Sequence, residues 1–151
     1  MQVCSFICNS KPYAIDILKV SEIIRPLNIT PVAHASKDIR GITNVRGDIK
    51  LIIDFNFMVD QKALPPDEDN RFILFKDSTG ENFGILVDKV GEIFELDDKH
   101  LGSYAQDGRD EDSAIFEGIC TVKDEVFIVV DPIKILEKCT SMEKQNHVVK
   151  I

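Results

Sequence analysis

The sequence predicts a mainly β protein built from two linked five-stranded barrels with short helices. One observation is that short apolar runs alternate with turn-forming residues along most of the 151-residue chain, which is typical of strands. The other is an internal repeat: residues 13–26 match 83–96 at an offset of 70, and residues 39–59 match 116–136 at an offset of 77. A repeat indicates two similar small folds, and barrel closure removes exposed strand edges. A single β-sandwich formed by both copies is the alternative.

Each copy begins with a predicted hairpin. In the first copy the apolar run 3–8 is followed by polar turn residues and a second strand at 13–17. In the second copy the run 72–75 is followed by a similar turn and a strand at 83–87. Compact apolar runs bounded by Asn, Ser, Pro, Asp and Gly predict strands joined by tight turns.

A third strand or single turn is predicted next, at 20–24 and 90–94, where a glutamate lies among apolar residues. Short helical turns are then predicted at 36–39 and 97–101. Each of these begins with a residue, serine or aspartate, that is favoured at helix N-caps.

Each copy ends with a second hairpin followed by a helix. The hairpin tips are residues 46–48 and 123–125, whose glycine or aspartate suits a tight turn. The last strand of each hairpin ends at an aspartate, Asp54 or Asp131. An aspartate N-cap followed by Pro132 at the first helical position is a helix-start signal.

These elements divide the chain into two halves, residues 1–64 and 65–151, whose terminal segments can cross over within one integrated domain. The polar segment 61–70 links the copies, and a charged loop at 102–113 is an insertion that accounts for the larger second offset. Half of this chain would bury too little surface to be stable alone, so we expect a shared interface. The tail after Cys139 either adds a strand or remains frayed.

Composition excludes several classes of function. The formal net charge is −8, which argues against nucleic acid or an anionic membrane surface as the main partner. The charge is uneven, because residues 1–64 carry 8 Lys+Arg against 6 Asp+Glu, whereas residues 65–151 carry 10 against 20. Neither a signal peptide nor an apolar stretch of about 18 residues is present, so we expect a cytoplasmic protein without membrane insertion.

The cysteines predict neither a metal site nor a disulfide framework. All lie in or beside apolar segments without a C-x-x-C pattern or a matching histidine pair, and we expect buried, reduced thiols. The four are Cys4, Cys8, Cys120 and Cys139. No cofactor is expected.

Catalytic candidates are few. The histidines His34, His100 and His147 share no spacing, and the sequence contains none of the common nucleophile, P-loop or zinc motifs. Asp54 and Asp131 are symmetric carboxylates at strand ends, so a two-fold acid/base pair is one hypothesis. We favour a cap on the following helix for each. A small-molecule-binding module, with an apolar pocket between the barrels, is a third hypothesis.

Four segments of the chain stand out together: YAIDILKVSEII (13–24), ITPVAHASKDIRGITNVRGDIKLIIDF (29–55), FGILVDKVGEI (83–93) and FEGICTVKDEVFIVVDPIKIL (116–136). In this order and spacing, they resemble the CheW-like domains of bacterial chemotaxis. The resemblance extends from about Val3 to Cys139, and its most specific part is the second segment. Departures from the family pattern are Val45 for leucine, Leu51 for proline, and Ala33 and Ser36 where a proline pair is common.

The resemblance implies two SH3-like barrels around a shared core and no catalytic activity. It further implies an adaptor that joins the cytoplasmic tips of methyl-accepting chemotaxis receptors to the histidine kinase CheA. The receptor tip would lie in a groove between the barrels. The resemblance does not indicate which residues of this chain would bind the kinase. A regulatory domain of CheA or of a CheW–receiver fusion is an alternative, although the initial Met and the lack of further segments favour a stand-alone protein. The implied receptor-binding positions are Val20, Glu22, Gly41, Asn44, Arg46 and Gly47.

Overall fold

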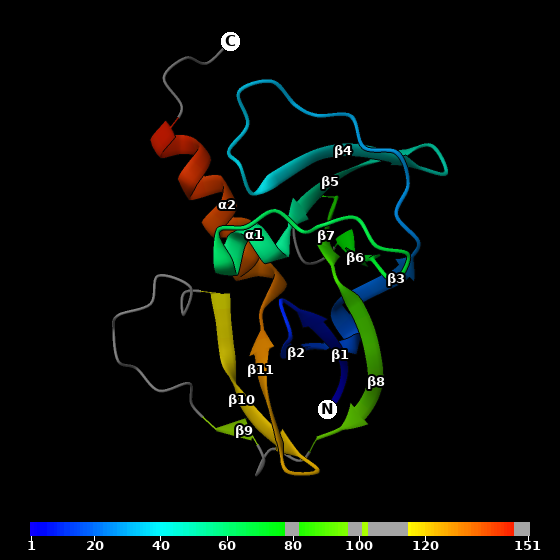
Figure 1. Ribbon diagram of the computed structural model, residues 1–151, viewed down its shortest axis with the longest axis vertical. Helices are drawn as coiled ribbons and strands as arrows, with labels where there is room; N and C mark the ends of the chain where they lie inside the picture. Colours follow the sequence, from blue (N-terminus) through cyan, green and yellow to red (C-terminus); the bar gives the residue numbers. More distant parts are fainter. Residues whose placement is uncertain (78–81, 97–100, 103–114, 147–151) are drawn as a thin grey trace.

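The computed structural model describes residues 1–77, 82–96, 101–102 and 115–146, and it confirms the mainly β architecture (Figure 1). The helical elements are the 3₁₀ turn η1 (Ile17–Lys19), α1 (Phe55–Asp60) and α2 (Pro132–Asn146). The strands are β1 (Gln2–Cys8), β2 (Lys11–Asp16), β3 (Val20–Ile24), β4 (Ile39–Val45), β5 (Asp48–Asp54), β6 (Arg71–Phe75), β7 (Phe83–Val87), β8 (Lys89–Glu95), β9 (Leu101–Gly102), β10 (Phe116–Val122) and β11 (Glu125–Val130).

Each copy of the repeat contributes its first hairpin to the sheet of the other copy. One sheet has the order β8-β1-β2-β11-β10-β9, and the other has the order β3-β6-β7-β5-β4. We call the first barrel A and the second barrel B; Figure 1 shows barrel B above barrel A. The two orders are the same after the repeat is applied, and both include one parallel pair, β11 with β2 and β5 with β7.

The exchange of hairpins means that strands from residues 1–64 lie in both barrels, as do strands from residues 65–151. Barrel A has a sixth strand only because β9 is long enough to count as one. Its counterpart in barrel B is a single bridge between Thr30 and Ile42. Neither half of the sequence forms a barrel without the other.

Strand bulges also follow the repeat. The register shifts after Val20 in β3, and the pairing of β8 with β1 shifts at the equivalent place. It shifts again after Ile39 in β4 and after Phe116 in β10. Because a bulge redirects the side chains around it, these positions determine where the neighbouring polar groups point.

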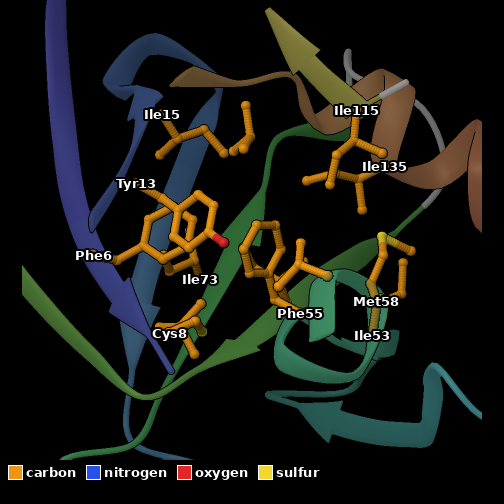
Figure 2. Packing of buried hydrophobic residues seen from close by; sticks show 14 of the residues in the cluster. Phe6, Cys8, Tyr13, Ile15, Ile53, Phe55, Met58, Ile73, Ile115 and Ile135 are labelled. Atoms are coloured by element: carbon orange, nitrogen blue, oxygen red, sulfur yellow. The ribbon is translucent and has the colours of Figure 1, made fainter. Parts of the chain in front are cut away.

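The largest apolar cluster lies between the two barrels. Figure 2 shows the rings of Phe6, Tyr13 and Phe55 packed together at its centre. The Phe55 ring meets the other two edge-on, at centroid distances of 5.1 Å and 4.9 Å. Burial of each such side chain stabilises the fold by about 1.5–3 kcal/mol. Met58 from α1 and Ile135 from α2 extend this cluster, so both helices contribute to the shared core.

Each barrel also has a small core of its own. Val3, Cys120 and Phe127 belong to the cluster of barrel A, and Val45 and Phe72 belong to that of barrel B. Two internal cores and one shared core are the arrangement expected for paired barrels rather than for a single sandwich.

All four cysteines are buried thiols, as the sequence predicts. Burial raises the pKa of the Cys8 thiol to about 12, with a smaller contribution from the charge of Asp88. Thiols with so high a pKa remain protonated at neutral pH and are poor nucleophiles.

Some predicted boundaries differ from the structure. Residues 36–39 form a turn closed by a hydrogen bond of 3.0 Å from the Ile39 amide to the Ser36 carbonyl, because β4 begins at Ile39 and leaves no room for a helix. The final helix runs to Asn146, so the tail begins later than Cys139. The predictions for 97–100 and for most of 102–113 fall outside the described residues.

Candidate docking site

The six predicted receptor-binding positions all lie in barrel B. β3 and β4 are the outermost strands of its sheet, and the two-residue turn after β4 leads into β5. The positions are Val20 and Glu22 on β3, Gly41 and Asn44 on β4, and Arg46 and Gly47 in the turn.

An ion pair joins the two outer edges of this sheet. Nη2 of Arg46 donates to Oε1 of Glu22, which connects the β4–β5 turn to β3. The Arg46 side chain is 70% exposed and that of Glu22 is 33% exposed. Because the guanidinium has five donors, most of them remain available to a partner. The pair therefore closes the barrel edge and places an arginine on the surface.

The bulge in β3 explains why Glu22 faces outward. In a regular strand, Val20 and Glu22 would point to the same side, since side chains alternate. The extra residue, Ser21, interrupts this alternation, and its hydroxyl donates to the Leu74 carbonyl at 3.3 Å. Val20 is consequently buried, whereas Glu22 reaches Arg46.

The turn that carries Arg46 is held by its neighbours. Arg46 has φ of 51° and Gly47 has φ of 93°, a left-handed pair that matches a type I′ hairpin turn. The Asn44 side chain accepts a hydrogen bond of 2.7 Å from the Gly47 amide. Asn44 and Gly47 thus fix the backbone from which the arginine projects.

Gly41 has a structural role. Its φ is 143°, and a Cβ there would overlap the carbonyl oxygen of Thr30. The close approach allows Thr30 and Ile42 to exchange two backbone hydrogen bonds of 2.8 Å and 2.9 Å, which attach the connecting segment 25–38 to β4. Of the six predicted residues, Val20 and Gly41 are buried. These two therefore support the strands of the site from inside the fold.

Ile49 is a surface residue that the sequence reasoning missed. It lies on β5 opposite Asn44 and is 52% exposed, close to the Arg46 turn. An isoleucine in a strand is normally assigned to the core. The repeat gave no signal for this exposure, because the equivalent residue Val126 is also apolar, and it too is 51% exposed.

The equivalent charges in barrel A do not pair. Glu92 and Lys123 occupy the positions of Glu22 and Arg46, and within the described ranges neither of them takes part in an ion pair. The two surfaces have therefore diverged despite their common backbone.

Asp54 caps a helix, as we favoured, and also anchors the chain beyond it. Its carboxylate accepts bonds from the Phe57 amide at 3.0 Å and the Leu64 amide at 2.9 Å, and Arg40 Nε lies 3.7 Å away. Only 1% of Asp54 is exposed.

Asp131 likewise accepts a bond of 3.0 Å from the amide of Ile133 at the start of α2. Both carboxylates are thus occupied by structural contacts, which argues against a two-fold acid/base pair. Among the residues that the structure describes, no group of three or more His, Cys, Asp or Glu side chains could hold a metal ion.

Comparison with known proteins decides the family. Residues 2–139 match the family model of the CheW-like domain. The chain belongs to the CheW-like family. It is 29% identical over 139 residues to the "Chemotaxis protein CheW" of Klebsiella aerogenes, covering 92% of this chain and 81% of that protein. It is 23% identical over 138 residues to the protein of the same name from Helicobacter pylori, covering 91% and 82%.

The fold agrees with this assignment. The crystal structure of the scaffolding protein TtCheW from Thermoanaerobacter tengcongensis superimposes with a TM-score of 0.77 at 26% identity, covering 85% of this chain and 87% of that one. Paired SH3-like barrels are therefore the fold of this protein. CheW-like proteins are adaptors and scaffolds, so the chain is a non-catalytic chemotaxis adaptor and the aspartate-enzyme hypothesis is wrong. In the described part of the chain, no helix has the length and apolar character needed to span a membrane.

Proposed function

We propose that this protein couples the cytoplasmic tips of methyl-accepting chemotaxis receptors to the histidine kinase CheA. In this proposal the receptor tip docks on barrel B at the Glu22–Arg46 pair. The observation that carries the proposal is the exposed arginine held by this pair beside the exposed Ile49. In this proposal the protein acts in the cytoplasm and reaches the membrane only through its partners.

The chemistry of this surface suits a helical hairpin. Such a partner docks through apolar side chains surrounded by polar contacts. Ile49 supplies apolar area, and Arg46 supplies a planar fork of donors for carboxylates or backbone carbonyls. Because Asn44 and Gly47 fix the turn, little backbone conformational entropy is lost when Arg46 engages a partner.

An adaptor must hold both partners at once, so the kinase has to use a surface that leaves Arg46 and Glu22 free. The two barrels present different surfaces at equivalent turns, since Arg46 pairs with Glu22 in barrel B, whereas Lys123 and Glu92 form no ion pair in barrel A within the described residues. Single contacts of this size are weak, and an array of many copies would increase the overall strength through avidity.

The test compares equivalent substitutions in the two barrels. Arg46→Glu places two carboxylates together and removes the donor fork, so we expect loss of pulldown with a soluble receptor-tip fragment and an unchanged circular dichroism spectrum. Lys123→Glu, at the equivalent turn of barrel A, is the matched control and should retain binding. Equal binding by Arg46→Glu and wild type would reject this docking site.

A further inference from the structure

The residue beside each helix cap has opposite charge in the two barrels. In barrel B the Nε of the bulge residue Arg40 lies 3.7 Å from Oδ2 of Asp54. The cation next to this helix cap therefore comes from the same barrel. The equivalent bulge residue in barrel A is Glu117, next to the cap Asp131. Two carboxylates at the start of α2 would repel each other without a cation.

That cation is Lys19, which comes from the connection between the barrels. Its Nζ lies 3.7 Å from Asp131 Oδ1 and 4.0 Å from Glu117 Oε2. The side chains of all three are between 18% and 33% exposed, so solvent screens this cluster only partly. Lys134, in the first turn of α2, donates from its Nζ to the Phe116 carbonyl at 3.5 Å.

The position of Lys19 in the chain links this cluster to the docking site. Lys19 is the last residue of η1, which joins β2 of barrel A to β3 of barrel B. Its carbonyl accepts a bond of 3.1 Å from the Lys76 amide at the end of β6. The β3 bulge and Glu22 follow within three residues. The start of β3 is thus held by its backbone to barrel B and by an ammonium to barrel A.

We propose that Lys19 is a positioning residue for the docking site, because its ammonium ties the start of β3, and with it Glu22, to barrel A. This inference rests on the proposed function of the Glu22–Arg46 surface. The repeat makes the assignment specific: the counterpart Lys89 is exposed at the start of β8, and no ion pair involves it within the described residues.

The first test removes the ammonium and keeps most of the apolar stem. Lys19→Met should speed amide hydrogen exchange in β3 and weaken binding of a soluble receptor-tip fragment at 25 °C by roughly twofold to fivefold, the range for a partly exposed ion pair. Lys89→Met is the matched control and should leave both measurements at their wild-type values.

The second test separates positioning from stability. Glu117→Arg gives Asp131 a cation from its own barrel, as Arg40 does for Asp54, and it repels Lys19. We expect thermal stability to be retained while β3 exchange becomes faster and the receptor-tip fragment binds more weakly. If Lys19 had a purely structural role, receptor-tip binding would weaken only in variants whose thermal stability also falls.

The inference is overturned if Lys19→Met and Glu117→Arg both show the wild-type rate of amide hydrogen exchange in β3 and the wild-type affinity for the receptor-tip fragment. Failure of the wild-type protein to bind the receptor-tip fragment would instead reject the proposed function. In that case hydrogen exchange in β3 still decides whether Lys19 positions the strand.

Discussion

The substitution Gly41→Ala is expected to destabilise barrel B strongly, because one added methyl group meets two obstacles. The first is conformational: φ of 143° is a region that residues with a side chain rarely adopt, at a cost of about 1–3 kcal/mol. The second is steric, since the new Cβ would overlap the Thr30 carbonyl oxygen and also approach Ile29.

Relief of this overlap requires the connecting segment 25–38 to move away from β4. The two hydrogen bonds between Thr30 and Ile42 would then be lost, at a cost of about 0.5–1.5 kcal/mol each. Together with the conformational cost, we expect the free energy of unfolding to fall by about 2–6 kcal/mol.

Gly47→Ala is the matched control. Gly47 also has a positive φ, 93°, but a Cβ there would meet no atom within 4 Å. Only the conformational cost of a left-handed backbone applies, so we expect a loss of about 1–2 kcal/mol. Urea unfolding measures both values, and hydrogen exchange at the Ile42 amide reports on the lost bridge. A Gly41→Ala protein within about 1 kcal/mol of wild type would refute the steric argument.

Three further sets of substitutions test the helix caps, the buried Cys8 thiol and the Glu22–Arg46 pair. Asp54→Ala leaves two amides without a partner and should cost about 2–3 kcal/mol, whereas Asp131→Ala loses one cap and should cost about 1 kcal/mol. Equal losses of stability in thermal unfolding would contradict this difference. The pKa of Cys8 rises from 9.0 to about 12 on folding, so the unfolded thiol ionises first and the free energy of unfolding should decrease above about pH 9. Cys8→Ala should make this decrease smaller. A decrease in the variant equal to that of the wild type would contradict the assignment to Cys8. The double variant Glu22→Arg with Arg46→Glu should regain the stability lost in Arg46→Glu without regaining receptor-tip binding. Full recovery of binding would show that the ion pair is needed for docking but that an arginine at position 46 is not.

The repeat allowed the strands, their turns and the two helix caps to be predicted from sequence. These features depend on local signals: Asp54 and Asp131 are followed directly by their helices, and the Arg46-Gly47 turn lies between two apolar runs. Local signals do not report which strands pair at long range. The parallel pairing of β2 with β11 joins segments more than 100 residues apart, and the exchange of hairpins follows from it.

The candidate site was only partly accessible to sequence reasoning for the same reason. Glu22 and Arg46 were both named, but their ion pair depends on the sheet order that brings β3 and β4 to its two edges. Val20 was placed in the site although the β3 bulge turns it inward. Ile49 was missed because an apolar residue in a strand has no sequence feature that separates surface from core.

The most direct test of receptor docking on barrel B is a hydrogen-exchange footprint of a soluble receptor-tip fragment on the intact protein. We expect protection of β3 and of the β4–β5 turn around Arg46, with β8 and the β10–β11 turn around Lys123 unchanged. Protection confined to β8 and β10–β11 would contradict it.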